Sequence, residues 1–223
     1  MNTTTTAARS VGAALRRSGQ QTNLLRAGIV AGPLLAAVSF AQIPFREGFD
    51  MTRHAFSFLL IGPGGWLQRV NYLVAGSLYA TAGIGLRAVL RGRTGIAAQC
   101  LAAGLGGGLI IAGAFPPPPS FGYPAGAPSG APAHVTVGAV MHGVGFGLGV
   151  LSLCGLLLVL SGWLWRRHQR RSAAAALTAA AALLTVPPTS AQPWGTVWLY
   201  VAVTASYCLT AALLAHLRPP TDT

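Results

Sequence analysis

Long apolar runs without a charged residue are the feature that most constrains how this chain can fold. The longest extends from Val135 to Trp165. As a helix it would be about 46 Å long, against roughly 30 Å for the hydrocarbon core of a bilayer. Charged residues make up only 8% of the chain, whereas a soluble domain carries about 25%. The sequence therefore predicts an all-α, polytopic membrane helix bundle whose surroundings are the lipid bilayer.

The apolar runs divide the chain into about six predicted transmembrane helices. A basic arm, residues 1–26, precedes them, and a short tail, residues 218–223, follows. The predicted spans are residues 27–45, 70–90, 95–115, 135–165, 172–187 and 194–217. The first run admits a second interpretation, because Ser39-Phe40-Ala41 has the small residues of a signal-peptidase site. Residues 116–133 contain too many prolines and glycines for a helix and predict a loop.

The arginines indicate how the chain is oriented in the membrane. If the N-terminus is cytoplasmic, twelve of the fifteen arginines are cytoplasmic, and only Arg46, Arg53 and Arg69 are external. An excess of this size is the positive-inside pattern of multi-pass proteins. We therefore expect a plasma-membrane protein with both termini in the cytoplasm. The net charge of +12 does not indicate a nucleic-acid partner, because the arginines lie at the ends of apolar runs and not on one soluble face.

Residues 45–72 are the polar exception in this apolar chain. They contain two of the three acidic residues, Glu47 and Asp50, together with three arginines. We expect a re-entrant or interfacial segment on the outer face, with Trp66 at the lipid–water boundary. Because external arginines oppose the positive-inside bias, we predict that Asp50 pairs with Arg46 or Arg53.

The same residues predict a polar face. On a helix, a rotation of 100° per residue would place Asp50, Arg53, His54 and Ser57 within an arc of about 100°. Two interpretations of this face remain open. It is either a set of salt bridges that staples the outer loop or a functional cluster.

His142 extends the functional interpretation to a second helix. It lies about 35 Å from the cytoplasmic end of the predicted fourth helix, and hence at the depth of the polar face. We predict that His54 and His142 line one pocket that opens to the outer leaflet, with Asp50, Arg53 and Trp66 around its rim. The candidate catalytic residues are Asp50, His54 and His142. The candidate ligand-binding residues are Arg46, Asp50, Arg53, His54, Ser57, Trp66, Asn71 and His142.

No metal site or cofactor is predicted. The histidines lack an HxxxH or HExxH spacing, and the three cysteines lie in apolar runs without a CxxC spacing. The run GVGFGLG at residues 143–149 lies inside a predicted helix, so it indicates close helix packing and not phosphate binding.

Several segments together resemble a known family. The chain contains, in order, FREGFDMTRHAFSFLLIGPGGWLQRVNY, AGAFPPPPSFGYPAGAPSGAP and VMHGVGF. This combination is similar to a group of actinobacterial integral membrane proteins, the domain of unknown function 998, over most of residues 27–217. The resemblance implies the same architecture and supplies no activity. Family members commonly have an acidic FPxDP where Phe115 is followed by four prolines, and a second histidine where this chain has Gly138.

Three classes of function agree with these features. The first is a binder of a lipid or other amphiphile at an outer-leaflet polar pocket. The second is an intramembrane enzyme that acts on a lipid or isoprenoid by general acid/base chemistry, and the third is a small transporter or accessory subunit. The near absence of charge within the spans favours the first class, because ion and proton pathways use charged residues inside the membrane. The sequence indicates no oligomeric state.

Overall fold

Helices dominate the computed structural model, which describes residues 3–132, 134–189 and 192–218. No strand is present among these residues, which confirms the predicted all-α class. The elements are α1 (Thr3–Gln42), η1 (Ile43–Phe45), η2 (Phe56–Leu60), α2 (Gly65–Leu90), α3 (Gly92–Ala114), α4 (Val137–Arg166), α5 (Arg170–Leu184), α6 (Val186–Thr189) and α7 (Gly195–His216).

Five of the described helices, α1, α2, α3, α4 and α7, are long and apolar enough to cross a membrane. This set indicates a multi-pass membrane protein, because a bilayer-spanning helix satisfies its backbone polar groups internally. The region predicted as a fifth span folds as α5, whose 15 residues reach about 22 Å, followed by the short α6. The first run forms part of α1, which packs against α2 and α7, so cleavage after Ala41 would remove a wall of the bundle.

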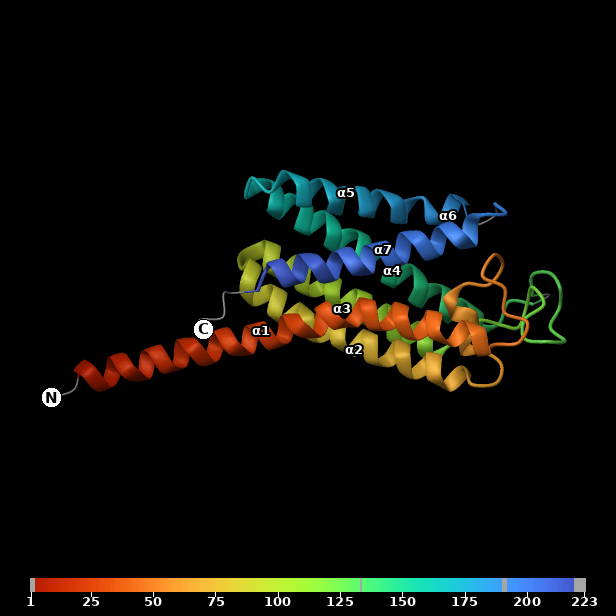
Figure 1. Ribbon diagram of the computed structural model, residues 1–223, viewed down its shortest axis with the longest axis horizontal. Helices are drawn as coiled ribbons and strands as arrows, with labels where there is room; N and C mark the ends of the chain where they lie inside the picture. Colours follow the sequence, from red (N-terminus) through yellow and green to blue (C-terminus); the bar gives the residue numbers. More distant parts are fainter. Residues whose placement is uncertain (1–2, 133, 190–191, 219–223) are drawn as a thin grey trace.

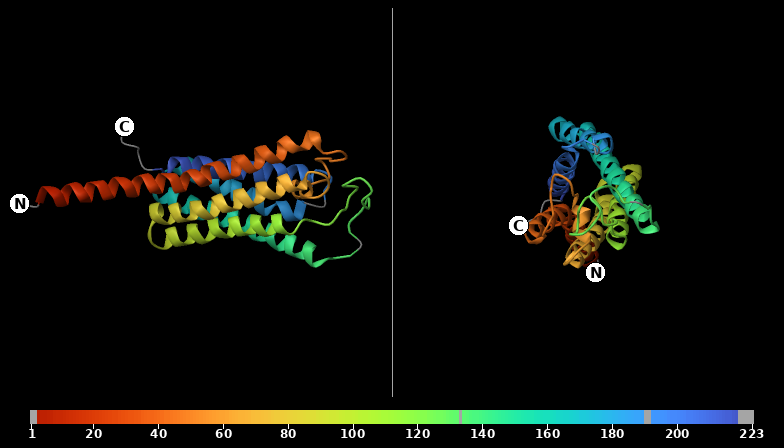
Figure 2. Two further views of the ribbon diagram at one scale, coloured as in Figure 1. Left: turned by 90° about the horizontal axis from the view of Figure 1, so that it is seen from below. Right: turned by 90° about the vertical axis from the view of Figure 1, so that its right-hand side faces the viewer.

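Adjacent helices of the bundle form a closed ring (Figure 2). Helix α1 packs on α2 and α7, α3 lies between α2 and α4, and α5 lies between α4 and α7. Helices α4 and α7 therefore face each other across the bundle, with α5 beside both of them.

The two ends of the bundle differ in structure and charge (Figure 1). Both termini and the tight turns between α2 and α3 and between α4 and α5 lie at one end. This end carries the arginines Arg87, Arg91, Arg93, Arg166, Arg167, Arg170 and Arg171. Residues 43–64, 115–132 and 134–136 lie at the opposite end, with Arg46, Arg53 and Arg69. The structure thus separates the arginines into the two groups that the sequence predicts.

Helices α3 and α4 approach closely where their glycines meet. A Cβ at Gly108 would lie 2.5 Å from the Gly149 nitrogen and 2.6 Å from the Gly145 carbonyl oxygen. Small residues of this kind allow membrane helices to pack at short range. A Cβ at Gly143 or Gly147 would meet nothing within 4 Å. The GVGFGLG run therefore has one packed face and one open face, as expected of a packing motif.

This contact gives a stability prediction with an adjacent control. Gly108→Ala should lower the free energy of unfolding by about 1–3 kcal/mol, because its methyl group would overlap the backbone of α4. Gly107→Ala should be neutral or stabilise by up to about 1 kcal/mol, because nothing lies within 4 Å of the added Cβ and alanine favours a helix. Thermal unfolding of both variants in detergent measures the difference. Equal melting temperatures would contradict the close packing of α3 and α4.

Candidate functional site

Residues 43–64, the cap segment, cover the end of the bundle opposite the termini (Figure 1). The helix predicted to carry a polar face here does not form, apart from the short 3₁₀ helix η2. The exposed Asp50 carboxylate accepts hydrogen bonds from the Thr52 backbone N–H at 2.8 Å and from the Thr52 hydroxyl at 2.7 Å. Local bonds of this kind compete with helix formation. The same bonds to Thr52 hold the pKa of Asp50 below its usual value.

Arg46 is a buried residue of the cap segment, and no carboxylate of the described residues forms an ion pair with it. The predicted pair between Asp50 and Arg46 is therefore wrong, whereas the charge of Arg53 lies close enough to Asp50 to contribute, as a minor cause, to the lowered pKa of that carboxylate. The Arg46 guanidinium instead donates to the carbonyl oxygens of Leu59 at 3.2 Å, Gly64 at 2.6 Å and Pro63, and to the Gln42 side-chain oxygen at 2.8 Å. Gly64 leaves room for this arrangement, because a Cβ there would lie 3.1 Å from a guanidinium nitrogen.

A buried polar network joins α1 to α2 next to Arg46. The Gln42 amide donates to the Gln68 oxygen at 2.7 Å, and the Gln68 amide donates to the Ser39 hydroxyl at 2.8 Å. Asn71 donates to the Leu35 carbonyl at 3.0 Å. Asn71, a predicted ligand-binding residue, therefore lies inside a helix–helix contact.

His54 is buried and connects three parts of the fold. Its Nδ1 accepts from the Asp50 backbone N–H at 2.9 Å, so Nε2 carries the proton and donates to the Phe121 carbonyl at 3.0 Å. The Tyr200 hydroxyl of α7 donates to the His54 carbonyl. The Tyr123 ring lies 5.3 Å from the imidazole. Nδ1 is therefore bonded within the cap segment, and Nε2 holds the cap segment to the loop that contains Phe121.

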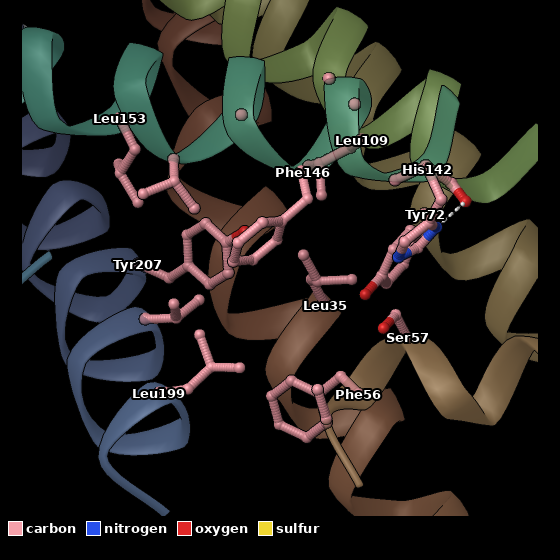
Figure 3. A pocket seen from close by; sticks show the side chains of 17 residues that line it. Leu35, Phe56, Ser57, Tyr72, Leu109, His142, Phe146, Leu153, Leu199 and Tyr207 are labelled. Atoms are coloured by element: carbon pink, nitrogen blue, oxygen red, sulfur yellow. Dashed lines mark hydrogen bonds between the residues drawn. The ribbon is translucent and has the colours of Figure 1, made fainter. Parts of the chain in front are cut away.

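An internal pocket lies beneath the cap segment, between α4 and α7 (Figure 3). The volume of the pocket that water centres can occupy is about 70 Å³. One water molecule needs ~10–15 Å³ on the same measure, so the pocket has room for several. Its walls come from α1, η2, α2, α3, α4 and α7. The lining residues are Leu35, Ala55, Phe56, Ser57, Tyr72, Gly108, Leu109, Ala112, His142, Gly145, Phe146, Gly149, Val150, Leu153, Leu199, Val203 and Tyr207.

The pocket reaches the surface of the bundle between α4 and α7. Phe146 of α4 lines the pocket and is nevertheless 40% exposed. Leu199 and Val203 of α7 line the opposite side and are half-buried. Partly exposed apolar side chains therefore form this edge of the pocket.

His142 is the pocket residue with the most defined polar geometry. Its Nδ1 lies 2.8 Å from the Phe115 carbonyl oxygen and 3.2 Å from the Ala112 carbonyl oxygen, at the end of α3. A carbonyl oxygen can only accept, so Nδ1 carries the proton. Nε2 has no hydrogen-bond partner within the described parts of the chain.

The structure brings only two of the predicted site residues, Ser57 and His142, into the pocket. His54 points into the aromatic cluster of the cap segment instead, so the prediction that it shares a pocket with His142 is wrong. Arg53 is exposed and donates to the Ser129 carbonyl at 3.4 Å. Trp66 is 67% exposed on the outside of α2. Within the described residues, no group of three or more His, Cys, Asp or Glu could hold a metal ion.

The sequence interpretation missed most of the apolar lining. On α4, residues 142, 146, 149, 150 and 153 recur at intervals of three or four and form one helical face toward the pocket. Intervals of three and four residues counted from His142 could have predicted this pocket-facing side of α4 from the sequence. Tyr72 and Tyr207 come from two further helices, and no pattern in the sequence places them together.

The fold and the pocket together define a class: a multi-pass α-helical membrane protein with an internal, largely apolar pocket. The chain belongs to the family described as Protein of unknown function (DUF998), whose profile matches residues 29–216. The family resemblance of the sequence segments is thereby confirmed. Searches among curated proteins and among solved structures found no match.

The contacts of Arg46 predict a difference between two arginines at the same end of the bundle. Arg46→Met would leave three backbone carbonyls and the Gln42 side chain without their donor, and should lower the free energy of unfolding by about 3 kcal/mol. Arg53→Met removes a single long bond from an exposed side chain and should cost less than about 0.5 kcal/mol. Thermal melting in detergent compares the two. If both variants melt together, Arg46 does not secure the cap segment.

Proposed function

We propose that this protein binds a single-chain amphiphile in the internal pocket, within the outer leaflet of the plasma membrane. The observation that carries the proposal is an apolar pocket between α4 and α7, with the partly exposed Phe146 in its lining and His142 at one end. Ligand pockets are typically apolar with a few well-placed polar groups.

The shape of the pocket suits an extended chain. His142 and Leu153 both line it and lie eleven residues apart on α4, a distance of about 16 Å along the helix axis. This length is about half of the hydrocarbon thickness of a bilayer. The narrow volume favours one chain over a bulky ring system.

The opening supports supply of the ligand from the membrane. Phe146, Leu199 and Val203 form its edges, and all three are apolar. An amphiphile that diffuses in the bilayer would therefore exchange one apolar environment for another along its chain, and would gain hydrogen bonds for its head group inside the pocket.

An enzymatic function receives less support from the same geometry. A nucleophile requires a base within hydrogen-bonding reach, and the Ser57 hydroxyl is not hydrogen-bonded to His142 in this structure. The other candidate catalytic residues, Asp50 and His54, are not part of the lining and are engaged by Thr52, the Asp50 backbone and Phe121. Transport is also less well supported, because no charged residue lines the pocket.

The arginine distribution predicts which end of the bundle faces outward. We expect both termini in the cytoplasm and the cap segment outside. In a variant without its native cysteines, a membrane-impermeant maleimide applied to intact cells should label Glu47→Cys and Ser129→Cys. It should label Arg91→Cys and Arg170→Cys only after permeabilisation. Labelling of position 91 or 170 in intact cells would overturn this orientation.

Occupation of the pocket can be tested with two substitutions on α7. Val203→Trp should fill the pocket and reduce the copurified amphiphile at least tenfold, because Val203 lines the pocket. Val201→Trp introduces the same side chain at a position that is 52% exposed on the bundle surface, and should leave the bound amphiphile unchanged. Native mass spectrometry and lipid extraction of each purified variant quantify the ligand. Equal ligand content in the two variants, or none in the wild type, would refute the proposal.

A further inference from the structure

The polar groups that face the internal pocket are few and uncharged. Among its lining residues, only Ser57, Tyr72, His142 and Tyr207 carry polar side-chain atoms. Ser57 of the cap segment lies close to Tyr72 and His142, whereas Leu153 lies toward the opposite end of the pocket (Figure 3). The pocket therefore has one polar end, and the rest of its lining is largely apolar.

A charged head group would be poorly accommodated at this polar end. No Asp, Glu, Lys or Arg is among the residues that line the pocket. Transfer of an unpaired carboxylate, phosphate or ammonium group from water into such surroundings is strongly unfavourable. The head group that fits is therefore an uncharged one.

His142 specifies the hydrogen-bonding character of that head group. Its Nδ1 proton is committed to the carbonyl oxygens of Phe115 and Ala112. No carboxylate lines the pocket to stabilise a second proton on the ring, so Nε2 presents a lone pair and requires a donor. An ether or ester oxygen cannot supply a proton, and an ionised carboxylate is also only an acceptor. A hydroxyl can donate to Nε2 and can also accept from the Ser57 hydroxyl.

We infer that the ligand is a neutral lipid alcohol, whose hydroxyl donates a hydrogen bond to His142 Nε2 while its chain extends toward Leu153. This inference rests on the proposed function, because it assigns the chemical class of the amphiphile bound in the same pocket. It places the hydroxyl beneath the cap segment, at the end of the bundle that carries the loops.

The test compares three probes of equal chain length on the wild-type protein in nanodiscs at pH 8. They are 1-dodecanol, its methyl ether 1-methoxydodecane, and dodecanoate. Thermal stabilisation as a function of probe concentration gives the apparent affinities, after correction for partitioning of each probe into the lipid. Dodecanol should bind about tenfold more tightly than the ether, because one buried hydrogen bond has a value of that order. Dodecanoate should bind at least as weakly as the ether.

A substitution at His142 removes the hydrogen-bond acceptor from the protein, just as the ether probe removes the donor from the ligand. His142→Phe keeps a planar ring and removes the acceptor, so it should reduce the affinity for dodecanol to that for the ether. The comparison of probes on wild-type protein does not depend on the folding of this variant. If wild-type protein binds the three probes equally, the hydroxyl assignment is wrong.

The Val203→Trp variant distinguishes a failure of the lipid-alcohol assignment from a failure of the proposed function. If it abolishes binding of all three probes although wild-type protein does not discriminate among them, amphiphile binding stands and the lipid-alcohol assignment fails. If Val203→Trp leaves the binding of every probe unchanged, the pocket is not the site and the proposed function fails as well.

Discussion

A buried backbone carbonyl that is not bonded within a regular helix needs a hydrogen-bond donor from elsewhere. The conformation of the whole cap segment depends on how its carbonyls obtain such a donor. Arg46 supplies that donor for Leu59, Pro63 and Gly64 at once. It is in turn held by Gln42, which belongs to the amide and hydroxyl network between α1 and α2. Through this chain of bonds the cap segment is fixed on the bundle, and residues 55–57 are fixed in the wall of the pocket. A guanidinium suits this role because it presents five donors in a rigid plane.

The helical architecture could be predicted from the sequence because apolar length and arginine position respond to the bilayer alone. The polar stretch was also correctly singled out, but its internal structure was not. The predicted helix around Asp50 assumed a regular rotation per residue, whereas Asp50 bonds to Thr52, two residues ahead, and turns the chain. The predicted ion pair treated Arg46 as a charge that needs an opposite charge. In the fold, carbonyl dipoles and an amide oxygen satisfy it.

The site was predictable only in part, because its residues converge from helices whose lateral order the sequence does not encode. His142 and Ser57 were selected as polar residues at the depth of the outer face, and both line the pocket. His54 satisfied the same criterion, yet its two nitrogens bond to Asp50 and Phe121 in the loops above. Depth alone cannot distinguish these cases. The uncharged network of Ser39, Gln42, Gln68 and Asn71 was overlooked because it adds no charge, although its members recur at intervals of three within α1 and α2.

The glycines of α4 have a kinetic consequence as well as a packing one. Each glycine in a helix interior weakens that helix by about 1 kcal/mol relative to alanine, and four of them fall in residues 143–149, the turns that border the pocket opening. Gly145 is held against α3, whereas Gly143 and Gly147 have no neighbour within 4 Å of an added Cβ. This stretch of α4 is therefore packed against α3 along one face and has no close neighbour along the other, where it is more flexible. Such a wall can fluctuate without separating from α3. For the proposed ligand, the rate of exchange would then be set by the flexibility of one helix, and the affinity by the residues that line the pocket behind it.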